Sequence, residues 1–360
     1  MTFHLLQKRA WSDQRGLTLL ELLVVLSILA VLSTVALTSS SGLADQARYE
    51  ATQRTLENIR EAVLGPANLR DTDGTLLYTG FVADTGRLPR AVAEVVAGGT
   101  VLTLAELFEQ PAGMAAYQVL PATTSNCTPS TEADAADPVP PAGVSADTVR
   151  LGVGWRGPYL RLTPGNLLPR DGWGAQLVTP VGVVPGFPNN CLLNGILPVA
   201  AGDPIDQIVS YGRDGALGGA DAYDADLNVD LQNQSVSTLV VQVEIRNPGG
   251  TLLDHTLVPP TIERIFVRLF EPNSATGSIS VQPARAPLGG PDPYDTYHSH
   301  SGPTLTFDPI TTSPGPRALR AYALENAVPP KPDQADHKSP PYYLSVRPGS
   351  NTVKLILTVP

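Results

Sequence analysis

The hydrophobic and polar positions divide the chain into an apolar N-terminal segment, an amphipathic continuation and a long region of short apolar runs. Residues 17–37 read LTLLELLVVLSILAVLSTVAL and contain one charged side chain, that of Glu21. At about 1.5 Å per residue, a helix over this segment is about 31 Å long, which is enough to cross the apolar core of a bilayer. We therefore predict a transmembrane helix over residues 17–37.

The same helix is predicted to continue to residue 64. Apolar residues recur near helical spacing over residues 43–63, with charged residues on the other faces, and Gly65-Pro66 ends the pattern. Residues 38–42 are poor helix formers, so we expect local weakening of the helix there rather than a fixed kink.

Residues 65–235 mix loops with short strands. We expect a turn-rich segment over residues 81–89, a short helix over residues 102–109 and a small antiparallel sheet that packs on the N-terminal helix. Trp155, Tyr159 and Trp173 lie close in sequence and are interpreted as core anchors, with a carbohydrate-stacking platform as the alternative.

Residues 236–360 carry alternating or continuous apolar runs that are separated by proline-rich turns. Such a pattern is typical of an antiparallel β-sandwich. The strands are predicted over residues 236–246, 262–270, 304–307, 317–324 and 352–359.

The composition agrees with a chain of strands and turns that follows one long helix. The sequence holds 35 prolines and 32 glycines in 360 residues, and both residue types favour turns. The formal net charge of -10 argues against nucleic acid as a partner. Cys127 and Cys191 lie in loop-like sequence. One disulfide between them is possible in an exported domain, and two free thiols are the alternative.

The N-terminal flank distinguishes three kinds of membrane segment. Residues 1–16 carry three basic residues and one acidic residue, so this end should stay cytoplasmic and the rest should cross. A secretory signal peptide has a shorter apolar region followed by a small residue, whereas Gly16 precedes the apolar run here. A plain anchor does not explain Glu21, because a carboxylate inside a bilayer is costly without a partner.

Residues 15–21, which read RGLTLLE, together with the apolar run resemble the cleavage motif of type IV prepilins. The resemblance implies that a prepilin peptidase cuts after Gly16 and methylates the amino group of Leu17, where phenylalanine is commoner. It also implies that Glu21 pairs with the α-amino group of a neighbouring subunit during filament assembly, which would satisfy a carboxylate in an apolar helix bundle.

Three later segments are similar to the globular domain of the major pseudopilins of type II secretion systems. They are residues 157–159 (GPY), 171–174 (DGWG) and 210–226 (SYGRDGALGGADAYDAD). Gly172 stands where that family has proline, and the last loop is about one residue longer. The resemblance implies a calcium site in this loop, and oxygen ligands among glycines suit that ion. Its expected ligands are Asp214, Asp221, Asp224 and Asp226, and a solvated acidic turn is the alternative.

We therefore expect an α+β fold with a leader peptide (1–16), a long hydrophobic helix (17–64), a pseudopilin-like domain on a small antiparallel sheet (65–235) and a C-terminal β-sandwich (236–360). The expected function is that of a structural subunit of a type II secretion pseudopilus or type IV pilus. Its partners would be prepilin peptidase and other subunits. It would begin in the bacterial inner membrane with its C-terminal part in the periplasm, and end in a filament or at the cell surface.

Two other functions remain open at this point. One is a minor pilin whose C-terminal domain binds a surface, a sugar or an exported substrate. The other is an anchored enzyme, although the sequence shows no nucleophile elbow, phosphate-binding glycine loop or HExxH helix. We expect a chain without catalytic activity.

Overall fold

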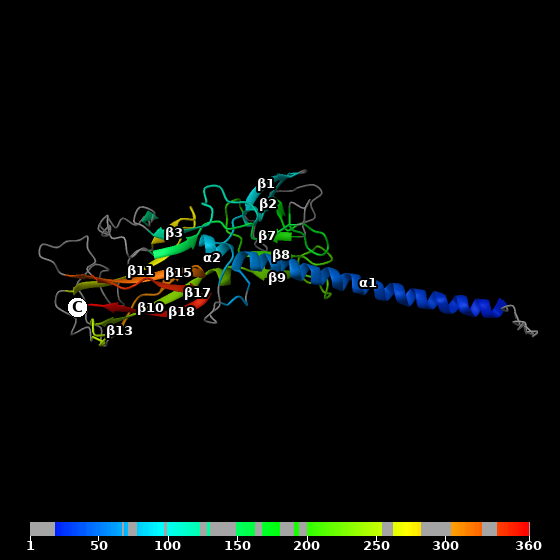
Figure 1. Ribbon diagram of the computed structural model, residues 1–360. Helices are drawn as coiled ribbons and strands as arrows, with labels where there is room; N and C mark the ends of the chain where they lie inside the picture. Colours follow the sequence, from blue (N-terminus) through cyan, green and yellow to red (C-terminus); the bar gives the residue numbers. More distant parts are fainter. Residues whose placement is uncertain are drawn as a thin grey trace, which may run out of the picture.

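The computed structural model shows an elongated molecule in which a long helix projects from a globular part (Figure 1). It describes residues 19–66, 68–70, 78–96, 99–122, 128–129, 149–162, 168–180, 191–193, 200–253, 262–281, 304–325 and 337–359.

Helix α1 spans Leu19–Leu64 and is continuous through residues 38–42. It ends at Gly65, whose φ of 87° is left-handed and whose backbone N–H donates to the Glu61 carbonyl at 2.8 Å. A Cβ at Gly65 would lie 2.0 Å from the Thr79 carbonyl oxygen, so only glycine fits here. The predicted end of the helix is confirmed.

Within the residues that the structure describes, no helix is long and apolar enough to cross a membrane.

The first globular region contains three small antiparallel sheets where the sequence predicted one. Helix α1 contacts strand β9 of one of these sheets. The sheets are β1-β2-β6 (Val92–Val96, Gly99–Thr103, Thr179–Pro180), β3-β5 (Gln118–Ala122, Val149–Val153) and β7-β8-β9 (Cys191–Leu193, Gln207–Ser210, Leu227–Asp230).

Two local predictions in this region were wrong. Residues 81–85 form the short helix α2 (Phe81–Thr85) where turns were expected, and all five of its side chains are buried. Residues 102–109 complete strand β2 and then form a single 3-10 turn, η1 (Ala105–Leu107), where a helix was expected. Both segments are too short for local preference to dominate, so tertiary burial decides their conformation.

The second globular region follows the short helix α3 (Gln232–Ser235) and contains two sheets. In one sheet, β10 (Ser237–Arg246) pairs with β13 (Thr304–Thr306), β14 (Ile310–Thr312) and β18 (Gly349–Thr358). The other sheet has the order β16-β15-β11-β12-β4, with β17 also paired to β15. Its strands are β11 (Ile262–Pro272), β12 (Ile279–Val281), β15 (Gly315–Glu325), β16 (His337–Lys338), β17 (Tyr342–Val346) and β4 (Thr128–Pro129).

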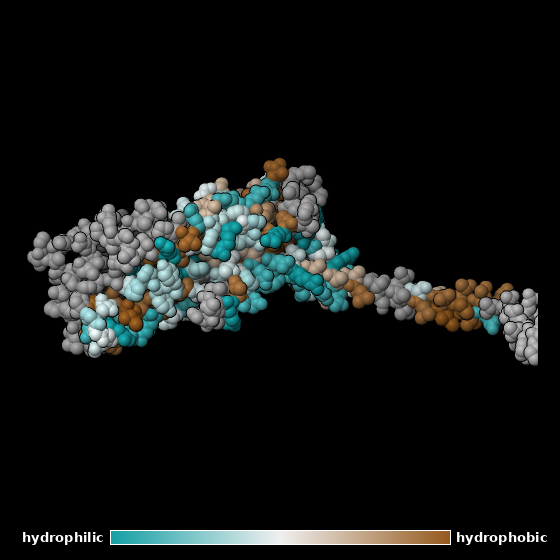
Figure 2. Space-filling view, in the orientation of Figure 1, coloured by the Kyte–Doolittle hydropathy of each residue, from teal (hydrophilic) through white to brown (hydrophobic). Residues whose placement is uncertain are grey.

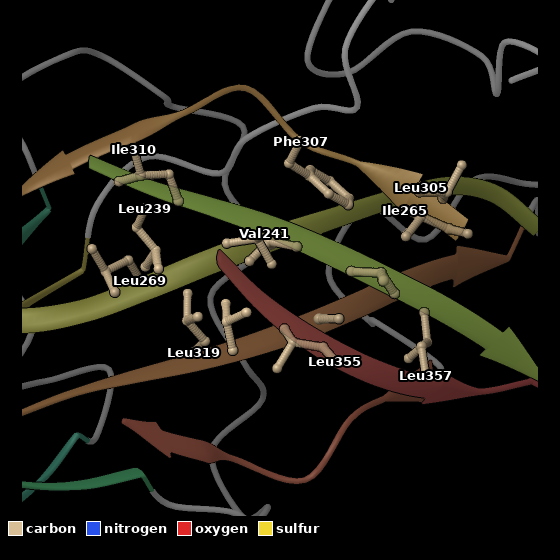
Figure 3. Packing of buried hydrophobic residues seen from close by; sticks show 14 of the residues in the cluster. Leu239, Val241, Ile265, Leu269, Leu305, Phe307, Ile310, Leu319, Leu355 and Leu357 are labelled. Carbon is tan, nitrogen blue, oxygen red and sulfur yellow. The ribbon is translucent and has the colours of Figure 1, made fainter. Parts of the chain in front are cut away.

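All five strands predicted for this region are present, but their pairing is not wholly antiparallel. Strand β18 runs parallel to β10 over ten residue pairs, from Ser237–Gly349 to Arg246–Thr358. Side chains from β10 and β18 point toward those of β11 and β15 (Figure 3). Together they form one apolar cluster that includes Leu239, Val241, Ile265, Leu269, Leu319, Leu355 and Leu357.

The two globular regions share a buried boundary. Residues of β5 pack with Phe270, Ile279 and Ala318 from the C-terminal sheet. Helix α2 contacts α1 on one side and β15 on the other. A Cβ at Gly315 would lie 2.7 Å from the Cβ of Ala83, which shows how closely the C-terminal sheet approaches α2.

Candidate assembly helix and acidic loop

The N-terminal half of α1 carries large apolar side chains that are exposed in the monomer. Figure 2 shows this part of the helix as an apolar rod beyond the more polar globular part. Glu21 lies in its first turn and is exposed as well. The exposed apolar residues are Leu19, Leu20, Leu22, Leu23, Val24, Val25, Leu26, Ile28, Leu29, Val31 and Leu32.

This exposure carries a large free-energy cost in water. Full burial of one such side chain is worth about 1.5–3 kcal/mol, so burial of the whole set is worth on the order of 20 kcal/mol. That exceeds the net stability of many globular domains, about 5–15 kcal/mol. The apolar half of α1 therefore requires an apolar environment, which a bilayer or the helices of neighbouring subunits can supply.

The C-terminal half of α1 is fixed to the globular region by a turn at residues 171–174. The backbone N–H of Gly172 donates to Thr52 Oγ1 at 2.9 Å. A Cβ at Gly172 would lie 1.9 Å from the Arg48 carbonyl oxygen. Proline, which the similar pseudopilins have at this position, has no N–H to donate and would collide with the helix. Glycine is therefore required by this close approach.

The buried carboxylate of Asp171 holds the same turn through hydrogen bonds. Its Oδ1 accepts the backbone N–H groups of Trp173 at 3.0 Å and Ala175 at 2.8 Å. Its Oδ2 accepts the hydroxyl of Ser210, at the end of β8, at 2.8 Å. Since the acidic loop starts directly after Ser210, one buried carboxylate positions both the turn and the loop against α1.

The acidic loop, residues 211–226, contacts α1 through Arg213. The guanidinium donates to both carboxylate oxygens of Asp224, at 2.8 and 3.0 Å. It also donates to Asp45 on α1 at 3.2 Å and to Asp221 at 3.4 Å. These hydrogen bonds raise the pKa of Arg213, and the hydrogen bond to Asp224 has the largest effect. The loop is therefore paired with a cation supplied by the chain itself, an arginine that stays exposed to solvent.

The four predicted calcium ligands are divided between two environments. Asp221 and Asp224 face Arg213, whereas Asp214 accepts the Ala216 N–H and Asp226 accepts the Gly218 N–H, each at 3.0 Å. The other oxygen of Asp226 is buried and has no hydrogen-bond donor. In the described part of the chain, no three acidic, histidine or cysteine side chains form a group that could hold a metal.

This arrangement does not fit a calcium ion coordinated by Asp224. Calcium takes six to eight oxygen ligands at about 2.3–2.6 Å. Both oxygens of Asp224 instead accept hydrogen bonds from the guanidinium of Arg213, and one oxygen of Asp226 is buried without a hydrogen-bond donor. Calcium binding stays a prediction, and the hydrogen bonds between Arg213 and Asp224 argue against it.

A second set of charged groups lies at the boundary between the two globular regions. Asp84 of α2 is buried, and its carboxylate accepts hydrogen bonds from Arg156 at 3.0 Å and from the Tyr159 hydroxyl at 2.9 Å. Burial raises the pKa of Asp84 to about 6, although the charge of Arg156 and the hydrogen bond from Tyr159 act in the opposite direction. Burial and the charge of Asp84 likewise raise the pKa of Tyr159.

Arg317 at the start of β15 is fully buried beside this cluster. Its guanidinium donates to the carbonyls of Pro316 at 2.7 Å, Pro314 at 3.1 Å and Ala83 at 3.3 Å. Burial lowers the pKa of Arg317 to about 10, against the charges of Glu271 and Asp84. The side chain remains charged at neutral pH and connects the C-terminal sheet to α2.

The predicted aromatic anchors pack in the core. Trp155 and Tyr159 are partly buried against the first apolar cluster and contact each other edge to face, with ring centroids 6.1 Å apart. The Trp155 indole N–H donates to the Glu106 carbonyl at 3.0 Å. Tyr49 of α1 makes edge contacts with Trp173 and with Tyr223 of the acidic loop. These contacts confirm the core-anchor interpretation for Trp155 and Tyr159, whereas Trp173 is partly buried against Tyr49 of α1 and belongs to no apolar cluster of the described residues.

Several predicted site residues lie outside the residues and side chains that the structure describes. They are the cleavage position at Gly16 and Leu17, and the candidate disulfide between Cys127 and Cys191.

Sequence reasoning missed the central role of Arg213, although a signal was present. Seven aspartates lie within residues 203–230, and Arg213 is the sole arginine or lysine between Arg170 and Arg246. A lone cation in so acidic a segment is the residue most strongly attracted to its neighbours. No sequence signal identified Asp45 and Thr52 as the helix positions that receive the two loops.

Comparison with known proteins addresses the N-terminal segment. Residues 11–37 match the family model of the prokaryotic N-terminal methylation motif, the signature of type IV prepilins and pseudopilins. The chain carries the prepilin signature. The motif implies processing by prepilin peptidase, assembly with pilin subunits and a membrane-anchored precursor of a filament. No curated protein and no solved structure matches the chain significantly.

Proposed function

We propose that this prepilin is the precursor of a structural subunit of a pilus-like filament, either a type II secretion pseudopilus or a type IV pilus. The observation that carries the proposal is the exposed apolar half of α1, which directly follows the methylation motif. The precursor is held at the inner membrane by this segment, and cleavage after Gly16 releases residues 1–16. In the filament, the apolar surface packs against the same surface of neighbouring subunits.

The test of processing is intact-mass and N-terminal analysis of the full-length chain, expressed with and without prepilin peptidase. We expect loss of residues 1–16 in the presence of the peptidase, with a methylated Leu17 as the new N-terminus. A chain that keeps Met1 to Gly16 beside an active peptidase would refute the proposal.

Glu21 allows assembly to be tested apart from processing. The variant Glu21→Ala should still be cleaved, but its filament yield should fall strongly because no carboxylate pairs with the α-amino group of the adjacent subunit. The matched control is Glu50→Ala on the same helix, which removes an exposed ion pair with Arg54 at 3.5 Å. Equal filament yields from the two variants would contradict this role of Glu21.

A second candidate function is that of a minor pilin with a C-terminal binding module. It is favoured by the position of the C-terminal sheets, which lie at the opposite end of the molecule from the start of α1 (Figure 1). In a filament packed through α1, this region would face outward. We infer that its two sheets form a β-sandwich, because their inward side chains share one apolar cluster. High abundance in sheared filaments would favour the structural role, and few copies per filament would favour binding.

We infer that the chain has no catalytic activity. The buried charged groups at Asp84 and Arg317 support this inference, because the hydrogen bonds of both side chains go to neighbouring protein groups.

A further inference from the structure

We propose that Arg213, and not a divalent cation, neutralises the acidic loop and fixes it to the assembly helix. The proposal concerns the folded monomer, so its failure would leave the filament proposal untouched.

Negative charges are concentrated in the acidic loop. The loop holds four aspartates, Asp214, Asp221, Asp224 and Asp226, and like charges that lie close together destabilise a compact loop. The glycines bring the two halves of the loop together, since a Cβ at Gly219 would lie 2.2 Å from the Asp224 carbonyl oxygen. A loop folded this tightly needs a positive charge.

The geometry of the Arg213 guanidinium matches the carboxylates around it. Arg213 binds Asp224 through two parallel N–H groups, a fork arrangement that suits a planar guanidinium and a carboxylate. The same guanidinium reaches Asp221 within the loop and Asp45 on α1. Its backbone N–H donates to the Tyr223 carbonyl at 2.8 Å, so both the main chain and the side chain of Arg213 close the loop.

Arg213 also connects the loop to helix α1. The contact between Arg213 and Asp45 joins residues 168 positions apart in sequence. Asp45 lies at the point where α1 leaves the globular region, between its exposed apolar half and its buried half. A calcium ion held within the loop alone would not replace this contact, because the carboxylate of Asp45 points to the guanidinium. Arg213 is therefore a positioning residue for α1 as well as a counter-charge.

The experiment compares thermal unfolding of the full-length chain in detergent, with excess EGTA and with 1 mM calcium chloride. We expect the Tm of the natural chain to change by less than about 1 °C between the two conditions. A site with a Kd a hundredfold below the calcium concentration would raise the Tm by roughly 5 °C or more. Such a rise would overturn the proposal.

The variant Arg213→Met provides the second arm. Its Tm should fall in both solutions because three carboxylates lose their counter-charge, by no more than about 4 °C because Arg213 is exposed and exposed ion pairs contribute little. The backbone amides of residues 45–49 and 211–226 should exchange hydrogen faster in this variant than in the natural chain. The matched control is Arg150→Met, an exposed arginine, which should leave both readouts unchanged. An Arg213→Met chain with the natural Tm and exchange would also overturn the proposal.

Discussion

The substitution Arg317→Met removes a positive charge from the boundary between the two globular regions. The side chain is fully buried, and three backbone carbonyls accept hydrogen bonds from it, those of Ala83, Pro314 and Pro316. Methionine has a similar length and can fill much of the space, but it offers no donor. The variant therefore separates the contribution of charge and hydrogen bonds from that of packing.

Two effects determine the magnitude. Removal of one partner from a buried charged network typically costs about 3–5 kcal/mol, because the remaining groups stay desolvated. Asp84 and Glu271 are the acidic groups whose charges act on Arg317, and both would lose that compensation. Apolar packing by methionine offsets part of the loss, so we expect a fall in unfolding free energy of about 3 kcal/mol. At about 2–4 °C per kcal/mol, the Tm should fall by roughly 6–12 °C.

The assay is thermal unfolding of the full-length chain, followed by circular dichroism, with hydrogen exchange of residues 81–86 as a local readout. Arg347→Met is the matched control, because this arginine is exposed, and its Tm should stay within about 2 °C of the natural value. If Arg317→Met kept the natural Tm and exchange, the buried charge would contribute no net stability, and packing alone would hold the two regions together.

Two further predictions concern glycine and pH. Gly172→Ala should lower the unfolding free energy by about 1–3 kcal/mol, because its Cβ would lie 1.9 Å from the Arg48 carbonyl oxygen. Gly42→Ala should instead raise helix stability by up to ~1 kcal/mol, because a Cβ there meets nothing within 4 Å. An equal fall in Tm in both variants would show that the close contact at Gly172 is not the cause. The pKa of Asp84 is about 6 in the folded chain and 3.8 ordinarily, so its stabilising contribution is complete below pH 3.8 and is lost as pH rises through 6. Relative to Asp84→Asn, the natural chain should lose about 3 kcal/mol of unfolding free energy between pH 3.8 and pH 6, as measured from unfolding curves in a pH series. If the unfolding free energies of both chains changed equally with pH, Asp84 would not titrate in this interval.

Local pattern was sufficient for the long elements. The end of α1 follows from a glycine that is followed by proline, and β10, β11 and β15 follow from apolar runs between proline-rich turns. Local pattern was not sufficient for short elements. Helix α2 has five residues, and burial between α1 and β15 gives it a stability that its own sequence does not provide.

The prepilin signature can be identified from the sequence alone, because a cleavage motif and an adjacent apolar helix are contiguous in the chain. The balance of charge in the globular part depends instead on contacts between residues that are distant in the sequence. Arg213 meets Asp45 across 168 positions, and Arg317 meets Ala83 across 234 positions. Aspartates that are spaced for a metal can equally accept hydrogen bonds from one arginine, and their spacing is the same in both cases. Which cation they bind depends on where the fold places the guanidinium, because electrostatic attraction acts through space over a few ångströms and not along the chain.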